Sequence, residues 1–196
     1  YRYAEAIDAH LATEPRGNLR IADIGCGAGP GAILAALRKP SAEVWALDIN
    51  PHALRFTAIN AELAGVQNLH IADSNLLDGV EGGFDLILSN PPYMFDVEER
   101  AYRHGGGEHG AGLSVAIVDA ALKRLTPGGT LLLYTGVAMF DGEDPFLGAV
   151  QPLLSEADVT WHYHEMDPDV FGEELLNPTY AKAERIAAVV LRVTRR

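Results

Sequence analysis

The chain has very little cysteine: Cys26 is the only one among its 196 residues. An internal disulfide bond is therefore excluded, which fits a protein of the reducing cytosol. The sequence also has no apolar run that approaches the ~20 residues needed to span a bilayer, and no secretory signal opens it. We therefore expect a cytoplasmic protein that does not cross a membrane.

Basic residues are scarce as well. The chain carries 15 Lys and Arg against 27 Asp and Glu, a formal net charge of −12. Because phosphate contacts require clustered Lys and Arg, we do not expect this part of the chain to grip a nucleic-acid backbone by itself. A protein or small-molecule partner is favoured. The first residue is Tyr1 and not Met, so we also expect an N-terminal segment ahead of it; a basic segment there would keep RNA open as a partner.

The overall composition predicts one globular domain over residues 1–196, since 48% of the residues are apolar and 21% are charged. Strand and helix patterns alternate, which predicts an α/β fold with a mostly parallel sheet. We expect helices over 3–14, 30–37, 51–64, 113–125 and 144–155, and strands over 19–24, 43–47, 69–72, 84–89, 130–135, 159–164 and 186–193. A glycine-rich loop with His104 and His109 is expected over 94–111, and a surface insertion from Glu165 to Arg185.

A glycine cluster joins the first strand to the next helix. Residues 23–31 read Asp-Ile-Gly-Cys-Gly-Ala-Gly-Pro-Gly. Glycines let the backbone turn tightly and approach a ligand, and the helix N-terminus offers free amides, so this segment predicts a nucleotide-cofactor site. Residues 27–32 also match the G-x-G-x-x-G/A pattern, with Asp48 at about the distance expected for a ribose contact. A nicotinamide-dependent oxidoreductase is therefore one interpretation.

Two further features favour a different cofactor. Asp23 directly precedes the glycines, where a carboxylate would oppose a pyrophosphate but would suit the ammonium and sulfonium of S-adenosylmethionine. The ends of the first four predicted strands also supply, in order, Asp23, Asp48, Asp73 and Asn90. The carboxyl ends of parallel strands meet at one edge, where open α/β sheets bind ligands. We therefore expect these four side chains at one site.

The segment Asn90-Pro91-Pro92-Tyr93 ends the fourth predicted strand. Neither proline has a backbone N–H, so the ladder cannot continue and the chain leaves the strand abruptly. The Asn90 side-chain oxygen and the Pro91 carbonyl are two acceptors for a planar nitrogen-bearing group, and Tyr93 offers a ring against which it can lie. The alternative is a simple turn after a buried strand; the cofactor site upstream favours the binding role.

Together these motifs resemble the class I S-adenosylmethionine-dependent methyltransferases that carry Asn-Pro-Pro-Tyr, strongly over residues 19–135. The resemblance implies a doubly wound, seven-stranded, mostly parallel Rossmann-like sheet with an antiparallel last strand. It implies methyl transfer to a planar amino nitrogen. The chain is most similar to release-factor glutamine methyltransferases, which implies a protein glutamine amide. The small-domain RNA amine methyltransferases share the turn, so an RNA base amine is the alternative.

The resemblance also implies roles for individual residues. Gly25, Gly27 and Gly29 would pass close to the methionine part of the cofactor, and Asp23 would lie near its amino group. Asp48 would accept hydrogen bonds from the ribose hydroxyls, and Ile49 would pack on the adenine. Asp73 would accept from the adenine amine, the alternative being a solvated loop carboxylate. Asn90, also next to the cofactor, and Pro91 would hold the target amine; Pro92 would also belong to the substrate-binding turn, and Tyr93 would stack on the substrate.

No metal is expected. His162 and His164 alternate on a predicted strand, but no Cys or acidic partner stands at ligand spacing. Cys26 is small and apolar within the glycine loop, which predicts packing rather than nucleophilic chemistry. One departure from the glutamine methyltransferases is Tyr134-Thr135-Gly136, where that family tends to have a glutamate after the fifth strand.

Overall fold

The structure is a computed structural model that describes residues 1–94, 105–106 and 110–196. His104 and His109, and most of the expected glycine-rich loop, lie outside the described residues. The elements in chain order are α1 (Arg2–Thr13), β1 (Arg20–Ile24), α2 (Pro30–Arg38), β2 (Glu43–Asp48), α3 (Pro51–Ala64), β3 (Leu69–Asp73), β4 (Phe84–Ser89), α4 (Gly112–Arg124), β5 (Leu125–Met139), α5 (Pro145–Glu156), β6 (Val159–Asp167), the 3-10 helices η1 (Gly172–Leu176) and η2 (Pro178–Tyr180), and β7 (Arg185–Arg195).

The described strands form one sheet in the order β3-β2-β1-β4-β5-β7-β6. Strands β1 to β5 pair in parallel, whereas β7 is antiparallel to both β5 and β6. This confirms the expected mostly parallel sheet with an antiparallel last strand. The strand order reverses between β1 and β4, so the switch point at which open α/β sheets bind ligands lies beyond the carboxyl ends of these two strands.

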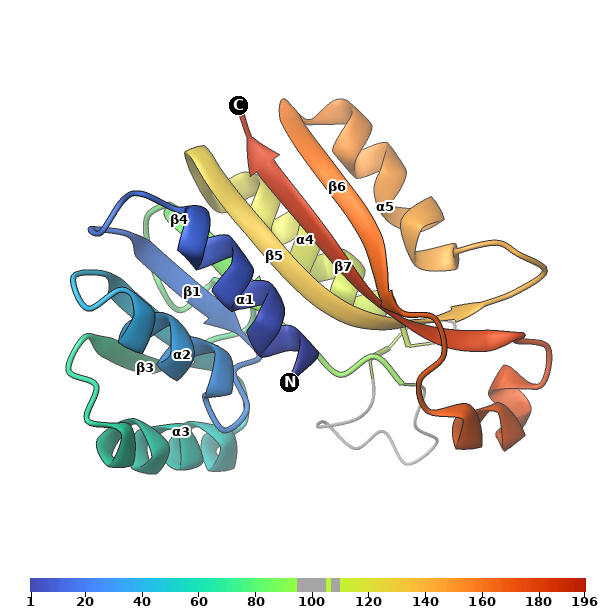
Figure 1. The fold of residues 1–196 in the computed structure, drawn as a ribbon, viewed down its shortest axis with the longest axis horizontal. Helices are drawn as coiled ribbons and strands as arrows, with labels where there is room; N and C mark the ends of the chain where they lie inside the picture. Colours follow the sequence, from blue (N-terminus) through green and yellow to red (C-terminus); the bar gives the residue numbers. More distant parts are fainter. Residues whose placement is uncertain (95–104, 107–109) are drawn as a thin grey trace.

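Helices cover both faces of the sheet (Figure 1). On one face α1, α2 and α3 pack through residues such as Ile7, Ala35 and Leu54. On the other face α4 and α5 pack through Ile117 and Phe146. None of the helices in the described part of the chain combines the length and the apolar character that crossing a bilayer requires.

The helices begin and end where their terminal residues direct. Asn50 caps α3 by accepting a hydrogen bond from the His52 amide, Pro51 occupies the first helical position, and Gly65 ends the helix in the left-handed conformation. At the start of α5, the Asp144 side chain accepts from the Leu147 amide at 2.7 Å. Local sequence therefore accounts for these boundaries.

Two expectations need correction at the far side of the sheet. Strand β5 extends to Met139 and β7 from Arg185 to Arg195, beyond the predicted 130–135 and 186–193, because the two strands pair over ten positions. The expected insertion is also more than a surface segment. Its first residues continue β6 to Asp167, and Tyr180 is only 1% exposed in a small core with Met94, Ala138 and Ile186. The weak periodicity of the segment does not reveal this core, because the members of the core come from distant parts of the chain.

Candidate functional site

A cavity of about 570 Å³ opens at the carboxyl edge of the sheet, at the switch point. Strand ends and the loops that follow them supply most of its wall. The described residues that line it are Ile24, Gly25, Gly27, Asp48, Ile49, Asn50, Ala53, Ser74, Asn75, Leu76, Asn90, Pro91, Pro92, Tyr93, Met94, Leu113, Ile117, Phe171, Glu173 and Glu174. The predicted glycine turn and the predicted Asn-Pro-Pro-Tyr turn therefore face a common space.

The glycine turn after β1 exposes bare backbone to the cavity. Gly25 and Gly27 have positive φ angles of 66° and 57°, and no atom lies within 4 Å of the place where a side chain would begin. A ligand can therefore approach this backbone closely. Gly29 differs: it starts α2 in the left-handed conformation, and a Cβ there would lie 2.8 Å from the Thr57 methyl group. Its role in the structure is packing against α3, away from the cavity lining.

Asp48, at the end of β2, is held against the glycine turn. One carboxylate oxygen accepts from the Gly27 amide and the other from the Asn50 amide, both at 2.9 Å. These bonds fix the orientation of the carboxylate at the cavity wall and leave it lone pairs for a ligand hydroxyl. Ile49, the next residue, is 61% exposed, so an apolar surface stands beside the carboxylate.

Asp23 does not reach the cavity. Its side chain is 2% exposed and accepts from the Tyr3 hydroxyl at 3.0 Å and from the Ala32 amide at 2.8 Å. Burial raises the pKa of this carboxyl to about 7, although both hydrogen bonds act in the opposite direction. The structure therefore has Asp23 tie α1 to the first turn of α2. Because its carboxylate does not face the cavity, Asp23 would not oppose a pyrophosphate bound there.

Asp73 is also outside the cavity lining, although it was expected at the adenine. The predicted strand ended at Ala72, but β3 includes Asp73, which pairs with Asp48 in the sheet. The loop that reaches the cavity therefore starts one residue later and presents Ser74, Asn75 and Leu76. Asn75 was not among the predicted site residues; the only signal for it was a polar amide two residues after the end of an edge strand.

The turn from Asn90 to Tyr93 lines the cavity along its whole length. The Ser89 hydroxyl donates to the Ile24 carbonyl at 2.7 Å, which joins the ends of β4 and β1 and aligns the two turns. Asn90 is exposed toward the cavity, whereas Pro91 is buried. The four residues thus adopt the abrupt strand exit that the two prolines predict.

Tyr93 lies on the backbone of β5. A Cβ at Gly136 would overlap the Tyr93 ring, so only glycine there leaves room for it. Burial raises the pKa of Tyr93 to about 12, and the phenol is therefore neutral near pH 7. Gly136, in the segment Tyr134-Thr135-Gly136 where the glutamine methyltransferases tend to have a glutamate, thus leaves the space that the Tyr93 ring occupies.

Three wall residues come from the segment between β6 and β7, which the sequence analysis left without a role. Phe171 lies with its ring centroid 6.0 Å from that of Tyr93, and Glu173 and Glu174 follow it along the same wall. Strand β6 is parallel to β1, so its carboxyl end is at the edge that holds the cavity. Strand topology was the one signal that could have located this segment.

The residues set aside from catalysis lie elsewhere or are inert. Burial raises the pKa of the Cys26 thiol to about 12, and its sulfur is 3.6 Å from the Thr57 hydroxyl, as packing requires. The rings of His162 and His164 are 5.2 Å apart on β6, away from the cavity. Within the described residues, no group of three or more His, Cys, Asp or Glu is placed to hold a metal ion.

Comparison with known proteins identifies the family. The model of the methyltransferase small domain matches residues 5–139. A release factor glutamine methyltransferase of Deinococcus radiodurans is 36% identical over 137 residues, which cover 63% of this chain and 49% of the relative. A ribosomal protein uL3 glutamine methyltransferase of Neisseria meningitidis is 35% identical over 126 residues, 58% of this chain and 41% of the relative.

The chain thus spans about half the length of these relatives. Among solved structures, a methyltransferase from Pyrococcus furiosus superposes with a TM-score of 0.65 at 21% identity, covering 98% of this chain and 82% of the other. At that identity the likeness concerns the fold alone. It supports the Rossmann-like methyltransferase architecture of the sheet.

Proposed function

The chain belongs to the methyltransferase small domain family, and on this premise we propose that it transfers the methyl group of S-adenosylmethionine to a planar amide nitrogen, that of a protein glutamine. One observation carries the proposal: the glycine turn, Asp48 and the Asn90–Tyr93 turn line a common cavity. The site thus offers a cofactor surface and an amide-binding surface within reach of each other.

The residues present fit S-adenosylmethionine. The open space beside Gly25 and Gly27 accepts the amino-acid end of a cofactor against bare backbone. We propose that Asp48, already oriented by two amides, accepts from the ribose hydroxyls, and that Ile49 packs on the adenine. Asn75 takes the place expected of Asp73, because it lines the cavity and an amide can both donate to and accept from an adenine edge.

When bound, this cofactor supplies an electrophilic methyl group carried on a sulfonium. The protein's own task is to hold an unreactive nitrogen in position, since the lone pair of an amide is delocalised. The Asn90 side-chain oxygen and the Pro91 carbonyl accept hydrogen bonds from the two N–H groups of the target amide, and the Tyr93 ring lies against the amide plane. These contacts favour a tetrahedral nitrogen with its lone pair directed at the methyl carbon. S-adenosylmethionine held by Gly25, Gly27 and Asp48 would supply the methyl group with sulfur as the leaving group, and the nitrogen held by Asn90 and Pro91 would give up one N–H proton.

The glutamine substrate is favoured by the relatives, which are named for glutamine methylation of release factors and of a ribosomal protein. The net charge of −12 supports the same choice over an RNA base. An RNA amine methyltransferase and a nicotinamide-dependent oxidoreductase are the outcomes that a test must separate from it.

The test combines binding with transfer. Calorimetry should detect S-adenosylmethionine and not NADH, and radiolabelled cofactor should label a glutamine peptide and not its asparagine counterpart. Binding of NADH alone would contradict the methyltransferase assignment. Labelling of an RNA oligonucleotide without labelling of the peptide would retain the chemistry and replace the substrate.

A further inference from the structure

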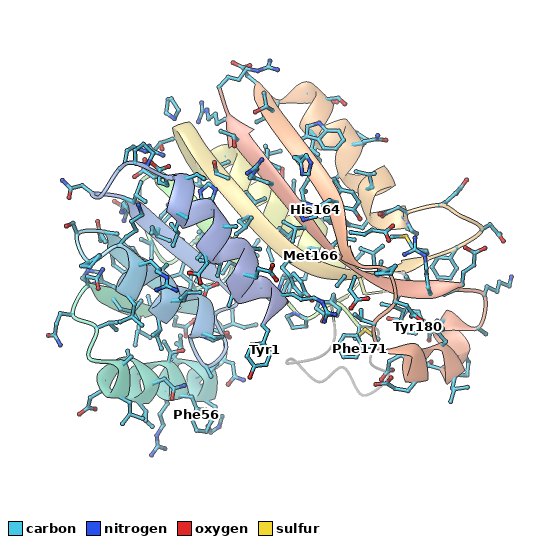
Figure 2. The ribbon with its side chains drawn as sticks, in the orientation of Figure 1. Tyr1, Phe56, His164, Met166, Phe171 and Tyr180 are labelled. Carbon is cyan, nitrogen blue, oxygen red and sulfur yellow. The ribbon has the colours of Figure 1, made fainter. Side chains whose placement is uncertain are left out.

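The β6–β7 connection (residues 168–184) is built into the carboxyl edge of the sheet. The Val170 amide donates to the Ile186 carbonyl at 2.6 Å, and the Glu184 amide donates to the Met139 carbonyl at 2.9 Å. Figure 2 labels Phe171 and Tyr180 on this connection, beyond the ends of β6 and β7. Tyr180 is buried together with Met94, which adjoins the Asn-Pro-Pro-Tyr turn. The connection is therefore anchored beside the Asn90–Tyr93 turn, on the side of the cavity proposed to bind the methyl acceptor (the acceptor side).

Phe171 is held in an unfavourable conformation at this wall. Its φ angle is 56°, in the left-handed region that a phenylalanine side chain disfavours. The side chain is nevertheless 43% exposed, so burial of the ring does not compensate for the strain. The conformation instead presents the ring to the cavity, tilted by 48° to that of Tyr93. Two aromatic rings thus border the space where a flat acceptor group would enter.

The charged residues among the described lining of the cavity are all acidic. Glu173 and Glu174 line the cavity together with Asp48, and none of the described lining residues is Lys, Arg or His. A phosphate-bearing chain that approached here would meet carboxylates, whereas a neutral or cationic peptide would not be repelled. The described part of this wall therefore offers carboxylates, and no basic side chain, to an incoming ligand.

We propose that the β6–β7 connection is the acceptor-recognition wall of this enzyme, with Phe171 packing beside the target amide and Glu173 favouring peptide substrates that carry basic residues near the glutamine. This inference rests on the proposed function and adds the substrate class and two specificity residues to it. Neither residue is required to touch the reacting atoms. Both act through the position and the residence time of the peptide.

Phe171 is tested by replacement with glycine, the residue that best tolerates its backbone angle. F171G should raise KM for a glutamine peptide about threefold to tenfold, the range expected for a lost aromatic contact. The kcat and the Tm should not fall, since strain is relieved, and the cofactor Kd should stay the same, since the residues proposed to bind the cofactor are unaltered. D141G is the matched control, because Asp141 has the same strained φ of 52° in a turn outside the cavity lining. An unchanged KM in F171G, or equal changes in both variants, would overturn the role of Phe171.

Glu173 is tested with two peptides that share a central Gln and differ only in flanking Lys or Glu pairs. Wild type should prefer the lysine peptide by about fivefold in kcat/KM, the upper range for exposed ion pairs, and less at high salt. E173K should reverse the preference, whereas E156K, on the exposed end of α5, should preserve it. Equal rates for the two wild-type peptides, or a preference that E173K leaves intact, would overturn the charge selection.

The two levels of the proposal fail in different ways. If wild type binds S-adenosylmethionine but labels neither peptide, the glutamine assignment fails and the acceptor wall fails with it. If wild type labels the two peptides at equal rates, and F171G has the same KM as wild type, the methyltransferase assignment stands and only the acceptor wall is wrong. Faster labelling of a single-stranded RNA oligonucleotide than of either peptide would overturn the peptide class.

Discussion

We have proposed that one wall of the cavity, with Gly25, Gly27 and Asp48, binds the cofactor, and that the other wall, with the Asn90–Tyr93 turn and the β6–β7 connection, binds the acceptor. These two walls, the cofactor wall and the acceptor wall, are constructed in different ways. The cofactor wall comes from neighbouring strand ends, where Asp48 binds the Gly27 amide directly. The acceptor wall combines residues far apart in the chain, since Tyr93 rests on Gly136 and faces Phe171. One wall is thus encoded locally and the other by topology, which suggests that substitutions will separate cofactor binding from acceptor binding. Four variants, ordered by their expected effect on methyl transfer, can break or sharpen this comparison.

The largest effect is expected for Asn90→Ala, which removes an acceptor from the target nitrogen while leaving the glycine turn unaltered. By analogy with the loss of one transition-state hydrogen bond, kcat should fall by about 10²-fold or more. The cofactor Kd from calorimetry should change little. Asn90→Asp keeps an acceptor oxygen and should recover part of the activity. A parallel collapse of cofactor affinity would show that Asn90 belongs to both walls.

The cofactor wall is broken by Asp48→Ala. Loss of a charged hydrogen-bonding group is expected to raise the Kd for S-adenosylmethionine by roughly tenfold to a hundredfold, from about 1.5–3 kcal/mol. Asp73→Ala is the matched control, because Asp73 pairs with Asp48 across the sheet but lies outside the cavity lining. Equal losses of affinity in the two variants would restore the original expectation that Asp73 holds the adenine.

Gly136→Ala tests the seat of Tyr93 in the acceptor wall. The added methyl group overlaps the ring, so we expect about 1–3 kcal/mol of destabilisation in urea unfolding and a lower kcat/KM for peptide, with the cofactor Kd unchanged. Gly148→Ala, in the first turn of α5 with open space around it, should instead stabilise by about 0.5–1 kcal/mol. If Gly136→Ala changes neither the stability in urea nor kcat/KM, the position of the Tyr93 ring does not matter for folding or for peptide binding.

The smallest effect on transfer is expected at Asp23, which lies behind both walls. Its folded pKa of about 7 is above the usual value of 3.8, so the folded state holds the proton more tightly than the unfolded state. The associated stability is therefore complete below about pH 4 and is lost as the pH rises through 7. Thermal unfolding of Asp23→Asn should lack this decline, whereas the exposed Asp158→Asn should retain it. A wild-type profile that is flat from pH 4 to 8 would contradict the assignment.

The difference between the walls also explains how far the sequence could predict the structure. Glycine spacing and strand-end carboxylates predicted a ligand site at Gly25, Gly27 and Asp48, and all three residues line the cavity, because local backbone geometry determines their positions. Asp23 and Asp73 also stand at strand ends but are not among the cavity-lining residues, since a strand-end position does not reveal whether a side chain turns toward the cavity or away from it.

The acceptor wall was predictable only at its turn. Two consecutive prolines impose the strand exit at Asn90, and the structure has that turn at the cavity. No periodicity marks Phe171, whose position depends on the antiparallel return of β7. Gly136 likewise has no local signature, because its requirement arises from a ring that reaches it from another strand.

The antiparallel return of β7 has a consequence for how such enzymes can diversify. The connection between β6 and β7 leaves and re-enters the sheet at adjacent strands, so its length does not alter the pairing of the others. Closing a longer loop costs only about 0.6 kcal/mol for each doubling of its length. Insertions at this point can therefore change the residues of the acceptor wall without altering the strand ends that form the cofactor wall. The β6–β7 connection can thus vary in length and sequence while the parallel strands keep their pairing.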